Sequence, residues 1–372
     1  LLLWPVVIYS LMERLRTDAK KYIWEGAITL QISLHDSEVT TLPPPPPALI
    51  LAPRIGFLPL LIPHIKPHFS GTLPPGVDTI WFDYKGLPLK WYMPTGVLFD
   101  LLCPEPERPW NLTVHFRGYP ADMLIPYEGE DSIKWSFINS LKEAAYIING
   151  NCKNVMNMSQ FDQVDLWNSV LHGNLETYLR ISSKLKLPAI SDEYTVNQDS
   201  CLLKFPPSTC ETDITGPVKT GKVPVRLYVW SVSNDFDDLE DAPPIDSWDQ
   251  VSYINRPVET YKEEGKCFTL GDAMKALLPE VFPDKQSGGE TISDASFGEE
   301  LRLPLEDASN KMDAEKLPCN IVACPLAELK LLRIQGIEPK LELPFSWVAN
   351  NLTNPEHFLH VCVCVKAPNL VS

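Results

Sequence analysis

Several short stretches of this chain alternate apolar and polar residues with the two-residue period of half-buried β-strands. In the first stretch, residues 22–36, one face carries Ile28, Leu30, Ile32 and Leu34. Similar stretches lie at 79–93, 110–116 and 223–231, and residues 330–366 indicate strand, turn, strand, short helix and strand. We therefore expect a β-hairpin to open the fold, and short strands joined by tight turns to follow it.

A second set of segments repeats apolar residues every three to four positions, as amphipathic helices do. These segments lie at 94–102, 136–149, 159–171, 175–181 and 269–282. Residues 54–69 are strongly apolar but contain Pro59, Pro63 and Pro67, and they predict a short, interrupted core helix.

Capping residues mark the ends of these helices. Asp131 or Ser132 is expected to cap the start of the helix over 136–149, and Gly150 to end it. Ser159, with Asp162 three residues later, and Thr269 are expected caps of two later helices. Their predicted buried stripes are Val164, Trp167 and Leu171 in one, and Leu270, Met274, Leu277 and Leu278 in the other.

The two ends of the chain repeat one pattern, G-x3-K-x3-P. It occurs at Gly86, Lys90 and Pro94, and again 250 positions later at Gly336, Lys340 and Pro344. The flanking elements follow in the same order, which indicates a duplication. Strand, strand, helix, strand, strand, short helix, strand is the order of the ubiquitin-like β-grasp. The sequence therefore predicts an α+β protein in which two ubiquitin-like β-grasp domains flank a helix-rich domain.

The pattern also predicts where these units begin and end. We expect an N-terminal segment with a short helix at 1–21, a first ubiquitin-like domain at 22–120 and a helix-rich domain at 121–182. A linker at 183–222 leads to the second ubiquitin-like domain at 223–368, within which the acidic residues 283–326 predict a disordered insertion.

Composition narrows the class of partner. The net charge of -16 argues against a protein that holds nucleic acid or anionic lipid, because both need clustered Lys and Arg. The nine cysteines include no C-x-x-C pair, which favours reduced thiols in a cytosolic protein. Cys362 and Cys364 share one strand face, where we expect them to be core residues.

The N-terminal stretch LLLWPVVIYSL lacks the basic start and the small-residue cleavage site of a secretory signal. We expect the native chain to begin at Met12, with residues 1–11 as an upstream addition. The apolar, cysteine-bearing run KLPCNIVACPLAE at 316–328 is a second candidate for an error in the gene model.

Signatures of enzymes are missing from the sequence: it has no G-x-G-x-x-G opening a helix, no G-x4-G-K-[ST], no H-E-x-x-H and no G-x-S-x-G. His64 and His68 are four residues apart, but Pro63 and Pro67 beside them argue against a regular helical pair of metal ligands. Cys103 and His115 are the weak alternative of a thiol nucleophile and its base. No catalytic residue, metal or cofactor is expected.

Long motifs are spread over the chain: IWFDYKGLPLKWYMPTGVLFDLL, PWNLTVHFRGYP, SLKEAAYIING, CFTLGDAMKALLPE and RIQGIEPKLELPFSWVANNL. Together they resemble the autophagy protein 5 family, and YIINGNCKNVMNMSQ is similar to its plant branch. The resemblance runs from Lys21 to Pro368, interrupted by the linker and the acidic insertion.

The resemblance implies a covalent role. Members receive the ubiquitin-like modifier autophagy protein 12 from a conjugating enzyme, through an isopeptide bond to a lysine in the L-K-E-A helix, here Lys142. The conjugate binds the coiled-coil autophagy protein 16 and acts like a ubiquitin ligase in the lipidation of autophagy protein 8. A cytoplasmic scaffold recruited to the phagophore membrane, with peripheral membrane contact through its complex, is therefore expected.

The residues alone leave the role of Lys142 open. Its neighbours Ile138 and Ala145 would favour a neutral amine by desolvation, whereas Glu143 would oppose this effect if it faced the same way. An ordinary solvated lysine is the simpler interpretation, and Lys134 and Lys153 are weaker candidates for the acceptor. The other functional hypotheses are an unconjugated adaptor that recruits proteins to membranes, and a cysteine-dependent enzyme of ubiquitin-like processing.

Overall fold

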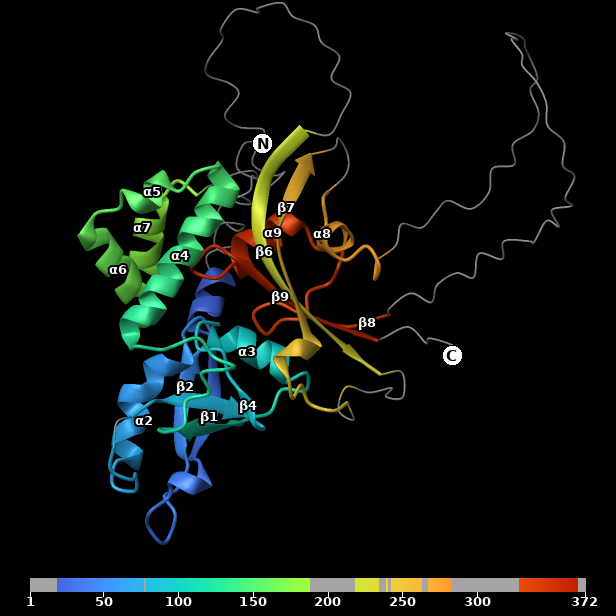
Figure 1. The fold of residues 1–372 in the computed structure, drawn as a ribbon. Coiled ribbons are helices and arrows are strands. Elements are labelled where there is room, and N and C mark those ends of the chain that lie inside the picture. Colours follow the sequence, from blue (N-terminus) through green and yellow to red (C-terminus); the bar gives the residue numbers. More distant parts are fainter. Residues whose placement is uncertain are drawn as a thin grey trace, which may run out of the picture.

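The structure is a computed structural model, and it describes residues 19–76, 78–187, 218–233, 239, 242–262, 267–282 and 328–366. The predicted addition at 1–11, the predicted insertion at 283–326 and most of the predicted linker lie outside the described residues. Two sheets lie one above the other in Figure 1, and a group of helices stands to one side of their junction.

The first sheet has the strand order β2-β1-β5-β3-β4. Its strands are β1 (Ala27–Leu34), β2 (Ala48–Pro53), β3 (Trp81–Tyr84), β4 (Leu87–Pro88) and β5 (Trp110–His115). The expected opening hairpin is present, because β1 pairs antiparallel with β2, whereas β1 and β5 run parallel in the centre. The expected interrupted helix is also present, as a 3-10 turn at Leu58–Leu61 followed by α2 (Ile62–Phe69).

The first strand is shorter than the pattern over 22–36 predicted. It begins at Ala27, because residues 19–25 are helical. In this helix Ile23 and Trp24 are buried, and the Trp24 ring lies 4.6 Å from that of Tyr178 in the middle helices. A tertiary contact therefore decides the conformation of this segment.

The second sheet has the strand order β7-β6-β9-β8. Its strands are β6 (Val218–Val232), β7 (Val251–Lys262), β8 (Glu328–Arg333) and β9 (Leu359–Lys366). One face packs with α8 (Leu270–Leu277) and α9 (Phe345–Leu352), and the other shares a core with the first domain. β9 is buried on both faces, which explains its unbroken apolar run and places Cys362 and Cys364 in the core as expected.

Two elements of this domain differ from the prediction. β7 was not predicted, because Pro257 and several polar residues hide the strand pattern of an edge strand. The strand expected after Gly336 was wrong, since residues 338–343 form none. Their carbonyl groups are used elsewhere: Leu341 and Leu343 accept hydrogen bonds from the first backbone N–H groups of α8.

The internal repeat is visible in the backbone. Gly86 and Gly336 both have positive φ, +88° and +74°, in equivalent turns. Pro94 and Pro344 are the N-cap residues of α3 (Thr95–Leu102) and α9, which are both eight residues long and also lie 250 positions apart. These observations support the predicted duplication.

The middle unit consists of α4 (Glu130–Asn149), α5 (Lys153–Met156), α6 (Gln160–Leu171) and α7 (Leu175–Lys184). Gly150, in the left-handed region, ends α4, and Ser159 caps α6 by accepting the N–H of Asp162, both as predicted. The predicted cap of α4 was wrong. Gly129 precedes the helix without a side-chain cap, and Ser132 accepts from the backbone N–H of Glu128 instead.

The predicted buried stripe of α6 was only partly correct. Trp167 is buried, but Val164 is exposed and Leu171 is half-buried, whereas Leu166 and Val170 lie in the core. Two overlapping apolar stripes are present on this helix, and helical periodicity does not say which of them faces the neighbouring helices. The four predicted core residues of α8 are all buried, and Thr269 forms a capping box with Asp272.

Candidate functional site

The helix α4 carries Lys142 and lies between the other middle helices and the second sheet (Figure 1). Its core face consists of Ile133, Phe137, Ile138, Leu141, Ala144 and Ala145, all of which are buried. Trp135 and Tyr146, which are 57% and 62% exposed, lie on the opposite side of the helix. Lys142 is half-buried and lies one turn before Tyr146, at the border of this exposed stripe.

Among the residues that the structure describes, the side-chain amine of Lys142 forms no hydrogen bond and no ion pair. The apolar side chains one turn away, Ile138 and Ala145, point into the core of the bundle. The amine is therefore available to a partner that approaches the exposed side of α4.

The adjacent carboxylate of Glu143 turns toward the second sheet. Its Oε2 accepts a hydrogen bond of 2.8 Å from Nη2 of Arg226 on β6, and its Oε1 accepts one of 2.7 Å from Asn255 on β7. Nη1 of Arg226 also donates to the hydroxyl of Ser140 at 3.2 Å. The Glu143 carboxylate is thus bound by Arg226 and Asn255 of the second sheet.

The two weaker candidates lie on the same group of helices. Lys134 is half-buried two turns earlier on α4, and Lys153 is exposed at the start of α5. Exposure alone does not distinguish these lysines from Lys142. The choice of acceptor therefore depends on the L-K-E-A motif.

The geometry is unfavourable for the thiol nucleophile. Cys103 is buried where α3 ends, and burial raises the pKa of its thiol to about 12. The ring of His115 stacks on that of Trp81 at 3.7 Å, and its Nε2 pairs with Asp83 at 2.5 Å. No contact between Cys103 and His115 occurs within the described residues. A thiol with a raised pKa and no base beside it is a poor nucleophile.

His64 and His68 lie on α2, so the expectation that the neighbouring prolines would prevent a regular helical pair was wrong. Both side chains line an open groove with residues 47–51 at the free edge of β2, and Nε2 of His68 contacts the carbonyl of Pro46 at 2.8 Å. In the described part of the chain, no cluster of three or more His, Cys, Asp or Glu could hold a metal ion.

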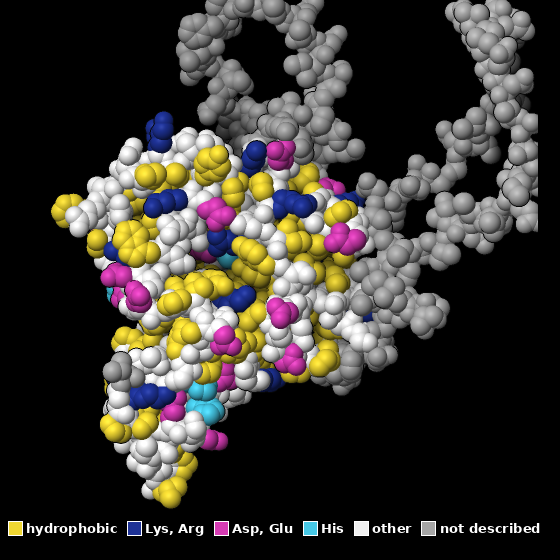
Figure 2. Space-filling model, in the orientation of Figure 1, with side chains coloured by type: hydrophobic (Ala, Val, Ile, Leu, Met, Phe, Trp, Pro, Cys, Tyr) yellow, Lys and Arg dark blue, Asp and Glu magenta, His cyan; other side chains and the backbone are white. Residues whose placement is uncertain are grey.

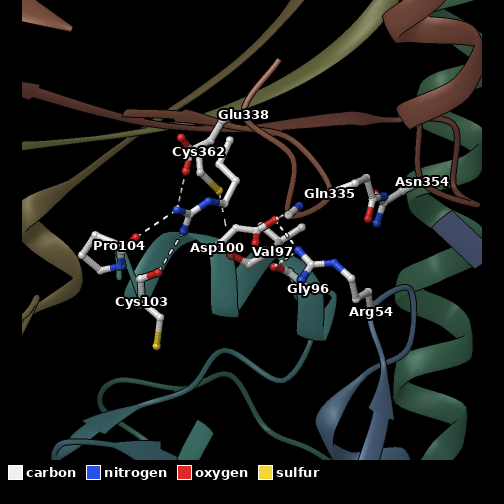
Figure 3. A network of polar contacts seen from close by, with 12 residues as sticks. Arg54, Gly96, Val97, Asp100, Cys103, Pro104, Gln335, Glu338, Asn354 and Cys362 are labelled. Carbon is white, nitrogen blue, oxygen red and sulfur yellow. Dashed lines mark hydrogen bonds and ion pairs between the residues drawn. The ribbon is translucent and has the colours of Figure 1, made fainter. Parts of the chain in front are cut away.

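A polar network joins the two ubiquitin-like domains (Figure 3). Arg54 forms an ion pair of 2.5 Å with Asp100 on α3, and the same carboxylate oxygen accepts the N–H of Gly336 at 2.7 Å. Burial raises the pKa of Asp100, and the Arg54 guanidinium opposes that shift. Arg333 on β8 donates to the carbonyl groups of Cys103 and Pro104, both at 2.9 Å, and so ties β8 to the C-terminal end of α3.

These pairs were missed by sequence reasoning. The available signal was Asp100, a carboxylate within the mostly apolar helix TGVLFDLL, because a buried carboxylate needs a partner. No comparable sign of the ion pair between Arg226 and Glu143 is present in the sequence, because these two residues lie 83 positions apart.

On the face seen in Figure 2, basic and acidic side chains are interspersed and hydrophobic side chains reach the surface between them. No helix among the described residues has the length and apolar character needed to cross a bilayer.

Comparisons with known proteins agree over the whole fold. Three family models match: the UblA domain of autophagy protein ATG5 at residues 23–116, its alpha-helical bundle region at 130–188 and its UblB domain at 222–363. The chain is similar to autophagy protein 5 of Arabidopsis thaliana, with 60% identity over 94% of this chain and 98% of that protein. It is 53% identical to autophagy protein 5 of Oryza sativa subsp. indica, over 94% of each chain.

A solved structure supports the fold. The crystal structure of Kluyveromyces marxianus Atg5 matches with a TM-score of 0.58 and 17% identity, over 93% of this chain and 99% of that one. The fold is therefore the predicted α+β arrangement, with two ubiquitin-like domains and a helical region between them. The three family models and the identity to the plant relatives show that the chain belongs to the autophagy protein 5 family.

Proposed function

We propose that this chain is a non-catalytic autophagy scaffold that is conjugated through Lys142 to the C-terminal glycine of autophagy protein 12. The observation that carries the choice of Lys142 is its place in the L-K-E-A motif of α4. In support, its amine has no hydrogen bond or ion pair among the described residues, and Arg226 holds the neighbouring Glu143 against the second sheet. The conjugate, with the coiled-coil autophagy protein 16, then promotes the lipidation of autophagy protein 8 at the phagophore membrane.

In the conjugation step, the chain itself supplies only a deprotonated amine in the right position. The amine must lose its proton, and a free lysine has a pKa of about 10.4. Its nitrogen then attacks the thioester carbonyl that joins the modifier to its conjugating enzyme. An amide C–N bond forms, the C–S bond breaks, and the electron pair leaves with the sulfur of the enzyme. The nitrogen gives up its second proton, which passes to the departing thiolate or to water. Most of the acceleration comes from holding the amine close to that carbonyl.

The decisive experiment is reconstituted conjugation with autophagy protein 12 and its activating and conjugating enzymes. Lys142→Arg is compared with Lys134→Arg and Lys153→Arg by gel shift and mass spectrometry, with circular dichroism to confirm folding. We expect only Lys142→Arg to abolish the adduct, because the guanidinium keeps the charge but is a poor nucleophile.

Two results would contradict this assignment. An undiminished adduct in Lys142→Arg would move the acceptor to another lysine, with Lys134 and Lys153 tested first. No adduct with the wild-type chain, under conditions where a known member of the family is conjugated, would favour the unconjugated adaptor. Flotation of the unmodified chain with liposomes would then test its recruitment to membranes.

A further inference from the structure

We propose that Arg226, a residue of the second ubiquitin-like domain, positions Lys142 for conjugation. It holds one turn of α4 against the second sheet and so fixes the direction in which the acceptor amine projects. This inference rests on the proposed function of Lys142 and adds a residue that lies 84 positions away in the sequence.

The contacts of Arg226 form a fork around the acceptor turn. Nη1 donates to Ser140 at 3.2 Å and Nη2 donates to Glu143 at 2.8 Å, and these two residues are three positions apart on α4. Lys142 lies between them in the sequence, within the turn that Arg226 holds. Asn255 on the neighbouring strand adds a third hydrogen bond, because it donates to the second oxygen of Glu143 at 2.7 Å.

Arg226 is itself held firmly. Its guanidinium lies 3.7 Å from the ring centroid of Phe358, and its side chain is only 16% exposed. Its backbone is in the interior of the sheet, where β6 pairs with β7 on one side and with β9 on the other. A planar, stacked guanidinium with two acceptors on one helix is a directional clamp, which a point charge could not replace.

Apolar packing and the Arg226 clamp constrain α4 in different ways. The buried residues of α4 hold the helix against its neighbours, but hydrophobic contact is non-directional and tolerates small rotations or shifts. Charge-assisted hydrogen bonds constrain both distance and angle. The clamp therefore sets the rotation of α4 about its own axis at the turn that carries Lys142.

Rotation at this turn matters for the chemical step. The attacking nitrogen must reach a near-attack distance of about 3–3.5 Å from the thioester carbon, and a misplacement of about 1 Å can cost roughly 100-fold in rate. Arg226 touches neither the thioester nor the amine, so it acts as a positioning residue. Its loss should slow the reaction of the bound complex more than it weakens binding of the thioester.

The test is single-turnover conjugation of the full chain with the preformed thioester between autophagy protein 12 and its conjugating enzyme, over a range of thioester concentrations. Arg226→Ala should lower the rate at saturation by about 10-fold, with the half-saturating concentration changed by less than about 2-fold. Glu143→Ala should give a similar loss. The double variant should lose little more than either single one, because both remove the same clamp.

The matched control is Arg180→Ala. Arg180 pairs with Asp165 on the same helical unit, but this pair is about half exposed, at 53% and 51%, and it lies on α6 and α7. We expect the Arg180→Ala variant to be conjugated at the wild-type rate. Arg226→Lys provides a milder variant, which retains the charge but cannot grip both acceptors in the same way, and it should fall between the wild type and Arg226→Ala.

Thermal melting identifies a variant that fails to fold, and Arg226→Lys and Glu143→Gln then carry the test. Wild-type saturation rates in the folded variants would overturn the proposal, as would a loss confined to the half-saturating concentration. Lys142→Arg in the same assay separates the two hypotheses. If that variant still forms the adduct, the proposed acceptor is wrong; if it does not, while Arg226→Ala reacts normally, only the positioning role is wrong.

Discussion

At the scale of residues, two ion pairs lie where units of the chain meet. Arg54 and Asp100 join the two ubiquitin-like domains, and Arg226 and Glu143 join the second domain to α4. Placing a charge in such a position costs desolvation energy, which pairing and hydrogen bonds offset. These side chains therefore specify how the units dock. In the more deeply buried pair, the removal of Asp100 leaves Arg54 buried and without its carboxylate.

Asp100→Ala tests this cost. The substitution leaves the guanidinium of Arg54, whose side chain is almost fully buried, without its carboxylate, so the free energy of unfolding should fall by about 3–5 kcal/mol. Asp165→Ala, which breaks the exposed pair with Arg180, should cost about 1 kcal/mol or less. Urea denaturation of both variants, followed by tryptophan fluorescence, provides the measurement. Equal losses would mean that the buried pair contributes no more than a surface pair.

At the scale of elements, the repeated glycine turn has different surroundings in the two ubiquitin-like domains. The turns at Gly86 and Gly336 share positive φ angles and lead to equivalent helices. A Cβ at Gly86 would meet nothing within 4 Å, whereas a Cβ at Gly336 would lie 2.8 Å from the Cζ atom of Arg54. The second turn has therefore become part of the junction between the domains.

The two glycines form a matched pair of substitutions. Gly86→Ala should cost about 1–2 kcal/mol, because an L-residue disfavours the left-handed region. Gly336→Ala should cost the same amount and a further 1–3 kcal/mol or so, because the new methyl group displaces the guanidinium of Arg54 from its partners. Urea denaturation of both variants measures the difference. An equal cost at both positions would show that Arg54 moves aside freely.

At the scale of the whole molecule, the turn before β9 is a second place where the helical unit meets the second ubiquitin-like domain, besides the contact of α4 with β6. The hydroxyl of Tyr178 on α7 donates to the carbonyl of Pro355 at 2.9 Å. Nε2 of His357 lies 3.1 Å from the hydroxyl groups of both Tyr178 and Ser182. Burial, with a smaller contribution from Lys20, lowers the pKa of His357 to about 4, so the packing of the two units favours a neutral imidazole.

This pKa predicts a pH dependence of stability. In the unfolded chain His357 takes up a proton near its ordinary value of 6.5, but in the folded protein only near 4. The unfolded state therefore gains protons first as the pH falls, and the contribution of this group to the free energy of unfolding decreases between pH 6.5 and about 4. Well above pH 6.5, His357 is neutral in both states, so it does not make the free energy of unfolding depend on pH.

His357→Asn isolates this effect, because asparagine does not titrate and tolerates the positive φ of +63° at this position. Thermal melting of both proteins from pH 7.5 to 4 gives the comparison. The wild type should lose more stability than the variant over the lower part of this range, although His360 and Glu356 titrate in both proteins. Parallel curves would indicate that His357 is accessible to protons in the folded state.

Local signals in the sequence determined much of this protein. The apolar alternation of β1, the caps at Ser159 and Thr269 and the repeated glycine turns depend on residues a few positions apart, and they are present in the structure as predicted. The family motifs identified the fold. The acceptor role of Lys142 also comes from such a motif, and it stays a prediction.

Only the tertiary structure decided how these elements meet. Gly336 contacts Asp100 across 236 positions, and Glu143 turns to Arg226 across 83, so no local pattern encodes either choice. A tertiary contact also decided the conformation of residues 338–343. Two of their carbonyl groups accept hydrogen bonds from the N-terminus of α8, whereas in a strand they would have bonded to a neighbouring strand. Secondary structure follows from neighbours along the chain, whereas the partners of buried polar groups follow from packing between segments that the chain brings together only on folding.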